Sequence, residues 1–216
     1  MGFAYSLVIF DLDGTLVDSL SDIAEAVNRT LAGRGLPAVP ESAVRSWLGD
    51  GSTALIRTAF AHVGGNIDIQ PVMPEFMRHY QDCLLRDLRL YPGVIDTLEA
   101  LKQKNVTLAI CSNKPEQFIR PLLEALKIDA CFSAILGGNS LAESKPSGLP
   151  LRYLAEKFAV PVSRCLMVGD SSADLHAAEN AGMPAALVSY GYTRDMDLKS
   201  VSARVVDDIR EILSPA

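Results

Sequence analysis

The 216-residue sequence has no long apolar run and no basic region. No segment approaches the ~20 consecutive apolar residues of a membrane-spanning helix, and Met1–Tyr5 lacks the basic residues that open a secretory signal. We therefore expect no membrane partner and no export. The formal net charge is −6, and no basic stripe with interleaved aromatic residues occurs, so we expect no nucleic-acid partner either.

Cysteine and histidine are scarce, and neither forms a recognisable pattern. The cysteines include no Cys-x-x-Cys pair, and His62, His79 and His176 do not have the spacing of metal ligands. Unpaired cysteines are typical of reducing compartments, which predicts a cytoplasmic protein without disulfides. The cysteines are Cys83, Cys111, Cys131 and Cys165.

Short apolar segments alternate with helical patterns along most of the chain. Apolar residues recur at helical spacing over 94–101 and again over 118–126. Strands that alternate with helices form right-handed βαβ units, so the sequence predicts an α/β fold with a Rossmann-like parallel sheet. The predicted strands are Leu7–Phe10, Val106–Cys111, Ala134–Leu136, Cys165–Val168 and Ala185–Val188.

The interval between the first two predicted strands is far longer than one crossover helix requires. Ser19-x-x-Asp22 is typical of a capping box, and it opens the first of several amphipathic helical patterns in this interval. We predict an all-helical cap over residues 17–85, inserted into an α/β core of residues 1–16 and 86–216. The cap begins directly after the first strand, so we expect it to cover the carboxyl end of the sheet.

Two aspartates directly follow the first predicted strand. Asp11 and Asp13 stand in the sequence Asp-Leu-Asp-Gly-Thr, behind four apolar residues that are typical of a buried parallel strand. Side chains two positions apart on extended backbone point to the same side, and open α/β sheets bind ligands at the carboxyl ends of their strands. Two carboxylates that lie so near each other require a cation or a shared proton. A Mg²⁺ ion beside a nucleophilic carboxylate meets this requirement and indicates phosphoryl transfer.

An ordinary acidic turn and half of a calcium-binding loop are the competing interpretations of this pentapeptide. A calcium loop of the EF-hand type needs glycine at its sixth position and glutamate at its twelfth. Leu16 and Asp22 occupy those positions, which excludes the calcium loop. The acidic turn stays open.

Further polar residues follow the next two predicted strands. Ser112 and Asn113 precede Pro115, which favours a helix start whose free N–H groups bind phosphate, although a simple turn or cap is the ordinary alternative. Lys145 precedes a proline that restricts its backbone to extended conformations. Its ammonium suits a carboxylate and a phosphoryl oxygen together, against the alternative of a solvated surface lysine.

Asp170 and Asp174 follow the fourth predicted strand. Asp170 is a candidate metal ligand, because Mg²⁺ favours a few hard carboxylate oxygens together with water and phosphate. Asp174 lies one helical turn later, where an acidic residue also caps a helix, so a purely structural role stays open. The joint order of Asp-x-Asp, Ser, Lys and Asp, each after a predicted strand, favours the catalytic interpretation.

These four signatures, in this order, resemble the haloacid dehalogenase-like hydrolase superfamily over essentially the whole chain. The predicted helical insert resembles the small α-helical cap of that superfamily. Shorter segments resemble the phosphoglycolate phosphatases within it. Those segments are Trp47–Gly51, Leu90–Val94, Ala181–Pro184 and Tyr190–Tyr192.

The resemblance implies a Mg²⁺-dependent phosphatase that hydrolyses a small phosphorylated metabolite, with 2-phosphoglycolate as the first candidate. Asp11 is implied as the nucleophile that forms an aspartyl-phosphate, and Asp13 as the general acid and then the general base. Lys145 is implied to neutralise developing charge and to orient Asp11. A sugar-phosphate phosphomutase or a pyrophosphatase is the alternative on the same fold.

The resemblance also implies a set of binding residues. The Asp11 carboxylate, the backbone carbonyl of Asp13 and Asp170 are implied as metal ligands, with Asp174 supporting the metal-bound waters. Ser112 is implied to hold a phosphoryl oxygen. Asn113 and Lys145 are implied to bind the substrate phosphate as well. Thr15 and Asn113 are implied to make no more than secondary contacts.

The cap is implied to read the part of the substrate that carries no phosphate. We predict that Gly49, Asp50 and Gly51 form its substrate-facing loop, with Arg45 or Arg57 as partners for a carboxylate. The alternative is that these arginines are solvated.

A receiver-type phospho-acceptor module is a remote alternative for the whole chain. It is remote because such a module needs neither a second aspartate nor a cap, and this sequence has Asp13 and a predicted cap. We expect a monomer or a homodimer.

Overall fold

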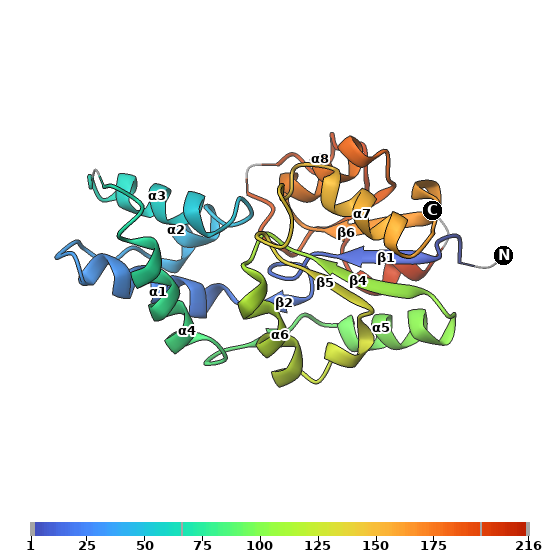
Figure 1. The fold of residues 1–216 in the computed structure, drawn as a ribbon, viewed down its shortest axis with the longest axis horizontal. Helices are drawn as coiled ribbons and strands as arrows, with labels where there is room; N and C mark the ends of the chain where they lie inside the picture. Colours follow the sequence, from blue (N-terminus) through green and yellow to red (C-terminus); the bar gives the residue numbers. More distant parts are fainter. Residues whose placement is uncertain (1–2, 66, 195, 215–216) are drawn as a thin grey trace.

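The computed structural model describes residues 3–65, 67–194 and 196–214. One lobe is a parallel sheet with helices on both faces, and the other lobe consists of helices inserted after the first strand (Figure 1). The arrow of the central strand points toward the helical lobe, so the carboxyl edge of the sheet faces that lobe. This arrangement confirms the predicted α/β fold.

Six parallel strands form the main sheet, in the order β5-β4-β1-β6-β7-β8. Leu7 of β1 lies opposite Thr107 of β4 on one side and Cys165 of β6 on the other. The chain order therefore reverses at β1, which is where Rossmann-like sheets bind their ligands. The strands are β1 (Leu7–Phe10), β4 (Thr107–Cys111), β5 (Ala134–Leu136), β6 (Cys165–Gly169), β7 (Ala185–Val188) and β8 (Arg204–Val206).

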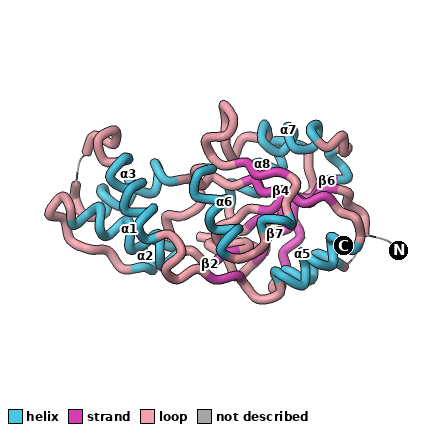
Figure 2. Tube along the Cα trace, turned by 60° about the horizontal axis from the view of Figure 1, so that its bottom comes forward, coloured by secondary structure: helices cyan, strands magenta, loops and turns pink. Residues whose placement is uncertain are grey.

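The alternation of side chains along β1 divides the core between the two faces of the sheet. Val8 and Phe10 belong to the apolar cluster that includes α5 (Val94–Gln103) and α6 (Glu116–Ala125). Leu7 and Ile9 belong to the cluster that includes α7 (Leu149–Lys157) and α8 (Ser172–Ala181). Both faces of β1 are buried, which explains its continuous apolar run. Figure 2 shows the strands in magenta between these two helical layers.

Four helices and a short strand pair form the inserted lobe. Val17 of β2 pairs with Leu90 of antiparallel β3, so both ends of the insertion leave the core at one place. The apolar cluster on the α5 and α6 face continues into this lobe through Phe60 and Phe76. The predicted cap boundaries lie next to the strand pair and remain a prediction. The elements are β2 (Val17–Asp18), α1 (Leu20–Ala32), α2 (Glu41–Arg45), α3 (Ser52–His62), α4 (Met73–Cys83) and β3 (Arg89–Leu90).

Short 3-10 helices at Asp129–Cys131, Val162–Arg164 and Ile209–Leu213 complete the core. Within the described ranges, every helix is either too short or too polar to pass through a lipid bilayer.

The predicted capping box at the start of α1 is wrong. Ser19 occupies the cap position but makes no side-chain cap, because its hydroxyl donates to Asp13 Oδ1 at 2.5 Å. Asp22 instead accepts hydrogen bonds from the backbone N–H groups of Arg86 (3.1 Å) and Asp87 (3.0 Å). Both side chains thus connect segments that are distant in sequence, and Asp22 ties the start of the helical lobe to its end.

We expect Asp22→Ala to lower the free energy of unfolding by about 1–3 kcal/mol, because two backbone donors lose their acceptor. Glu25→Ala on the same helix removes only an exposed ion pair with Arg29, 2.8 Å long, and should cost at most about 1 kcal/mol. Urea denaturation followed by circular dichroism measures both changes. Equal losses in the two variants would contradict the tethering role of Asp22.

Candidate active site

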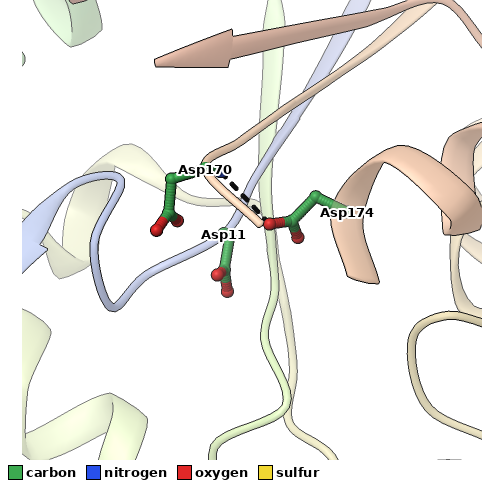
Figure 3. Close-up of side chains that lie close together, drawn as sticks. All are labelled: Asp11, Asp170 and Asp174. Carbon is green, nitrogen blue, oxygen red and sulfur yellow. Dashed lines mark hydrogen bonds between the residues drawn. The ribbon is translucent and has the colours of Figure 1, made fainter. Parts of the chain in front are cut away.

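The reversal of strand order at β1 brings three predicted site residues to one edge of the sheet. Asp11 directly follows β1, Ser112 follows β4 and Asp170 follows β6. The parallel pairing extends one residue beyond β1, since the backbone N–H of Asp11 donates to Val168 O at 2.9 Å. Figure 3 shows Asp11, Asp170 and Asp174 close together at this edge.

Lys145 reaches the same edge from the segment between β5 and α7. Its Nζ lies 3.0 Å from Asp11 Oδ1 and 2.5 Å from Asp174 Oδ1. The lysine side chain is only 2% exposed, which excludes the alternative of a solvated surface lysine. The structure therefore places Lys145 between a candidate nucleophile and a candidate supporting residue.

Asp174 has two roles in the structure: it caps a helix, and it contacts a residue of the candidate site. Its Oδ2 accepts hydrogen bonds from the N–H groups of Asp170 (3.2 Å) and Ser171 (3.0 Å) and from the Ser171 hydroxyl (2.6 Å). The first of these is the dashed line in Figure 3. Asp174 thus caps the start of α8 with one oxygen and holds Lys145 with the other.

Asp170 is fixed by two donors and a close turn. Thr15 Oγ1 donates to Asp170 Oδ1 at 2.7 Å, and the N–H of Tyr192 donates to Oδ2 at 2.6 Å. Gly14 has φ +88°, and a Cβ at this position would lie 2.2 Å from Asp170 Oδ2. Glycine is therefore required in the turn after Asp13 both for its backbone conformation and for the approach of Asp170.

The charges at this edge are not balanced. Burial raises the pKa of Asp11 to about 6; the Lys145 ammonium opposes this shift, and the Asp174 carboxylate adds to it. Burial also raises the pKa of Asp170, and the carboxylates of Asp174 and Asp11 add to that shift. Burial disfavours the charged form of Lys145, but Asp11 and Asp174 outweigh this effect and raise its pKa. One buried ammonium thus faces three buried carboxylates.

The donor set fits a small divalent cation. Asp11, Asp170 and Asp174 each offer a carboxylate oxygen, and these oxygens lie within 4.8 Å of one another. Asp11 Oδ1 is buried and, although ion-paired, accepts no hydrogen bond from the part of the chain that the structure describes. Hard oxygens with uncompensated negative charge are the ligands that Mg²⁺ prefers. Both oxygens of Asp170 and both oxygens of Asp174 accept hydrogen bonds, so Asp11 Oδ1 is the carboxylate oxygen with the most freedom to bind an ion directly.

A second buried lysine, to which no sequence pattern assigns a role, contacts Asp13. Lys114 Nζ donates to Asp13 Oδ2 at 2.7 Å and to the Tyr80 hydroxyl at 2.6 Å. Burial disfavours its charge, but the neighbouring Asp13 carboxylate and Tyr80 outweigh this and raise the pKa of Lys114. Lys114 lies two positions after Ser112, and this spacing past a strand end is the one local signal that could have drawn attention to it.

Ser112 and Asn113 differ in how free their polar groups are. The Ser112 hydroxyl accepts a weak hydrogen bond of 3.3 Å from the N–H of Lys114, which leaves its proton available. The Asn113 amide nitrogen donates to Gly49 O (2.9 Å) and Lys145 O (3.0 Å), so it joins the two lobes. The roles of both residues in phosphate binding remain predictions.

The predicted cap loop contributes its backbone to the site, while its charged side chain points elsewhere. Gly49 and Gly51 line the cavity over Asp11, whereas the Asp50 carboxylate pairs with Arg194 Nη1 at 2.6 Å. Arg194 also donates to the backbone oxygens of Trp47 (2.8 Å) and Leu48. The loop is therefore bound to the core by Arg194, which no sequence pattern singles out.

The two arginines predicted as carboxylate partners lie outside the cavity. Arg45 Nη2 donates to the backbone oxygens of Tyr190 (3.1 Å) and Gly191 (2.6 Å), and its guanidinium lies 5.0 Å from the centre of the Tyr192 ring. Arg57 is exposed and is not among the residues that line the cavity. A substrate carboxylate would have to find another partner.

The cavity between the lobes has a volume of about 70 Å³. Asp11, Asp13 and Asp170 line its floor, while Leu55, Phe76 and other residues of the helical lobe form its largely apolar roof; the lining also includes Ser112, Lys114 and Tyr80. Since one water position requires roughly 10–15 Å³ measured in this way, the cavity suits a small ligand.

Comparison with known proteins decides which family shares this arrangement. The family described as haloacid dehalogenase-like hydrolase matches residues 8–188, which include all four strand-end signatures. The chain belongs to this family. The haloacid dehalogenase-like assignment confirms that the chain is a hydrolase.

Relatives within the family confirm the resemblance to phosphoglycolate phosphatases. The chain is 39% identical to the phosphoglycolate phosphatase of Haemophilus influenzae, over 99% of each chain. A crystal structure described as a predicted phosphoglycolate phosphatase from Haemophilus somnus has 37% identity and a TM-score of 0.91, over 97% of both chains. CbbY from Rhodobacter sphaeroides, in complex with phosphate, has a TM-score of 0.82 at 24% identity over 96% of both chains, and shows the fold alone.

In protein freed of divalent ions, we expect Asp11→Asn to gain stability relative to the wild type as the pH rises from about 4 to 7. The folded pKa of about 6 exceeds the ordinary 3.8. The stability that protonated Asp11 contributes is therefore complete below the unfolded pKa and lost as the pH rises through the folded pKa. Two pKa units correspond to roughly 3 kcal/mol at most.

Urea denaturation in EDTA at several pH values measures this difference. Asp82→Asn is the matched control, because the Asp82 side chain is 53% exposed and should show no comparable trend. A difference between wild type and Asp11→Asn that does not change with pH would contradict the buried, repelled state of Asp11.

Proposed function

We propose that the protein is a Mg²⁺-dependent phosphatase that hydrolyses a small phosphate monoester, with 2-phosphoglycolate as the first candidate. The observation that carries this proposal is the buried group of Asp11, Lys145 and Asp170 beneath a small cavity between the lobes. Phosphoryl transfer requires mainly positioning and neutralisation of charge, and this group supplies both. The names of the relatives support the choice of substrate.

The proposed metal site uses the carboxylates of Asp11 and Asp170 and the backbone carbonyl of Asp13. Asp174 holds Lys145 and supports the ligands from behind through the turn at Ser171. A Mg²⁺ ion held by these residues would supply positive charge that offsets the carboxylates and helps to orient a phosphoryl group toward Asp11. Unbalanced negative charge at this edge supports such an ion.

Asp11 is the proposed nucleophile. Its carboxylate oxygen forms a bond to phosphorus while the ester P–O bond breaks, and the electron pair of that bond goes to the leaving oxygen. Asp13 gives this oxygen a proton and later accepts one from the water that attacks the aspartyl-phosphate. The second attack releases inorganic phosphate and restores the Asp11 carboxylate.

The remaining residues position the phosphoryl group. Lys145 neutralises its developing charge and orients Asp11, to which it is ion-paired at 3.0 Å. The free proton of Ser112 suits a phosphoryl oxygen. Asn113 and Thr15 act indirectly in this proposal, because Asn113 joins the lobes and Thr15 holds Asp170.

A phosphomutase or a pyrophosphatase with the same core is the second candidate. A mutase needs room for a sugar that carries two phosphates in turn, and the small cavity volume of about 70 Å³ favours a smaller ester. We further propose a cytoplasmic location, which is supported by the absence of disulfides among the described cysteines.

We expect Mg²⁺ to raise the melting temperature of the wild type in a concentration-dependent way, because a ligand that binds only the folded state stabilises it by mass action. Asp170→Asn should abolish this rise, since it removes a proposed ligand, and Asp82→Asn should retain it. Differential scanning fluorimetry at pH 7.5 measures all three proteins. A full Mg²⁺ effect in Asp170→Asn would refute the proposed metal site.

Phosphate release from a panel of esters in the presence and absence of Mg²⁺ tests the function. The panel contains 2-phosphoglycolate, hexose phosphates and pyrophosphate. Preference for phosphoglycolate supports the proposal, and preference for another ester keeps the chemistry but overturns the substrate. Conversion of a hexose 1-phosphate to its isomer without phosphate release would identify a mutase instead.

A further inference from the structure

Lys114 occupies an unusual position between the two lobes. Its side chain is 4% exposed and extends from the segment after β4 toward Asp13. Its ammonium also lies 4.7 Å from the centre of the Tyr80 ring, and this ring is held between Phe76 of the helical lobe and Phe118 of α6. The surrounding aromatic side chains therefore fix the place of the charge.

Lys114 is the one cation among the described residues that line the cavity. The other charged lining residues are Asp11, Asp13 and Asp170, and Lys145 lies behind them, paired with Asp11 and Asp174. The helical lobe contributes mainly apolar side chains, and its arginines Arg45 and Arg57 lie elsewhere. Among the residues that line the cavity, Lys114 is thus the positively charged partner for an anionic group on the leaving-group part of a substrate.

We infer that Lys114 binds the carboxylate of the substrate and selects esters of 2-hydroxy acids. This inference rests on the proposed function. Of its three donors, the ammonium uses two on described residues, namely Asp13 Oδ2 and the Tyr80 hydroxyl. The third donor is available for a substrate oxygen.

The connectivity of such a substrate matches the position of Lys114. In 2-phosphoglycolate, a single carbon atom separates the ester oxygen from the carboxylate. Asp13 has to contact the ester oxygen in order to protonate it, and Lys114 Nζ lies 2.7 Å from the Asp13 carboxylate. A substrate whose ester oxygen lies beside Asp13 can therefore reach Lys114 with its carboxylate.

Tyr80 makes the binding of the carboxylate depend on the helical lobe. Its hydroxyl accepts a hydrogen bond from Lys114 and comes from α4, whereas Lys114 belongs to the core. The carboxylate site is thus complete only when the lobes are together. The ammonium that would select the substrate thus belongs to the core, and Tyr80 of the helical lobe orients it.

The test compares 2-phosphoglycolate with ethyl phosphate, which has the same two-carbon leaving group without the carboxylate. A charge-assisted hydrogen bond contributes about 1.5–3 kcal/mol, which corresponds to a loss of roughly 10- to 100-fold. We expect Lys114→Met to lower the ratio of kcat/KM for phosphoglycolate to that for ethyl phosphate by this factor, mainly through the KM for phosphoglycolate. Lys114→Gln provides a second variant of similar length should Lys114→Met not fold.

Lys102→Met is the matched control, because Lys102 is an exposed lysine of α5 and is not among the residues that line the cavity. We expect its ratio to equal that of the wild type, since the substitution removes a lysine charge without touching the site. Parallel losses on both esters in the Lys114 variants would mean that Lys114 only positions Asp13, and would overturn the inference. Failure of the wild type on phosphoglycolate, with activity on other esters, would instead refute the proposed substrate and the inference with it.

Discussion

Repulsion among buried carboxylates at the end of β1 is the constraint on which the site depends. Lys145 offsets part of it through ion pairs with Asp11 and Asp174, and a net negative charge remains. The strand order brings these groups together, and Gly14 provides the space in which Asp170 can approach. A divalent cation would offset this remaining negative charge and allow an anionic phosphate ester to approach Asp11, which is why the geometry suits phosphoryl transfer.

Much of this arrangement could be predicted from local sequence. The apolar runs that form β1, β4 and β6 are buried almost throughout, so their boundaries are visible in the sequence as abrupt changes to polar residues. Ser112 and Asp170 follow such changes directly. Parallel topology then requires that residues after neighbouring strands share one edge, and the structure places them there. The short, partly exposed strand β8 carries no comparable signal and was missed.

The features that could not be predicted depend on distant partners. Ser19 and Asp22 have the spacing of a capping box, but Asp13 and the backbone at 86–87 compete successfully for their side chains. Lys114 looks like an ordinary polar residue before a helix, and its burial follows from Tyr80 and Asp13, which lie 34 and 101 positions away. Local propensity cannot report such contacts, because they exist only after the lobes have come together.

Trapping the phosphorylated enzyme tests the central claim most directly. Wild-type protein is mixed with Mg²⁺ and 2-phosphoglycolate, quenched with acid within milliseconds and digested, and its peptides are analysed by mass spectrometry with and without hydroxylamine. We predict a hydroxylamine-sensitive phosphoryl group on Asp11, absent from Asp11→Asn. A phosphoryl group on another residue, or phosphate release by Asp11→Asn at the wild-type rate, would contradict the account.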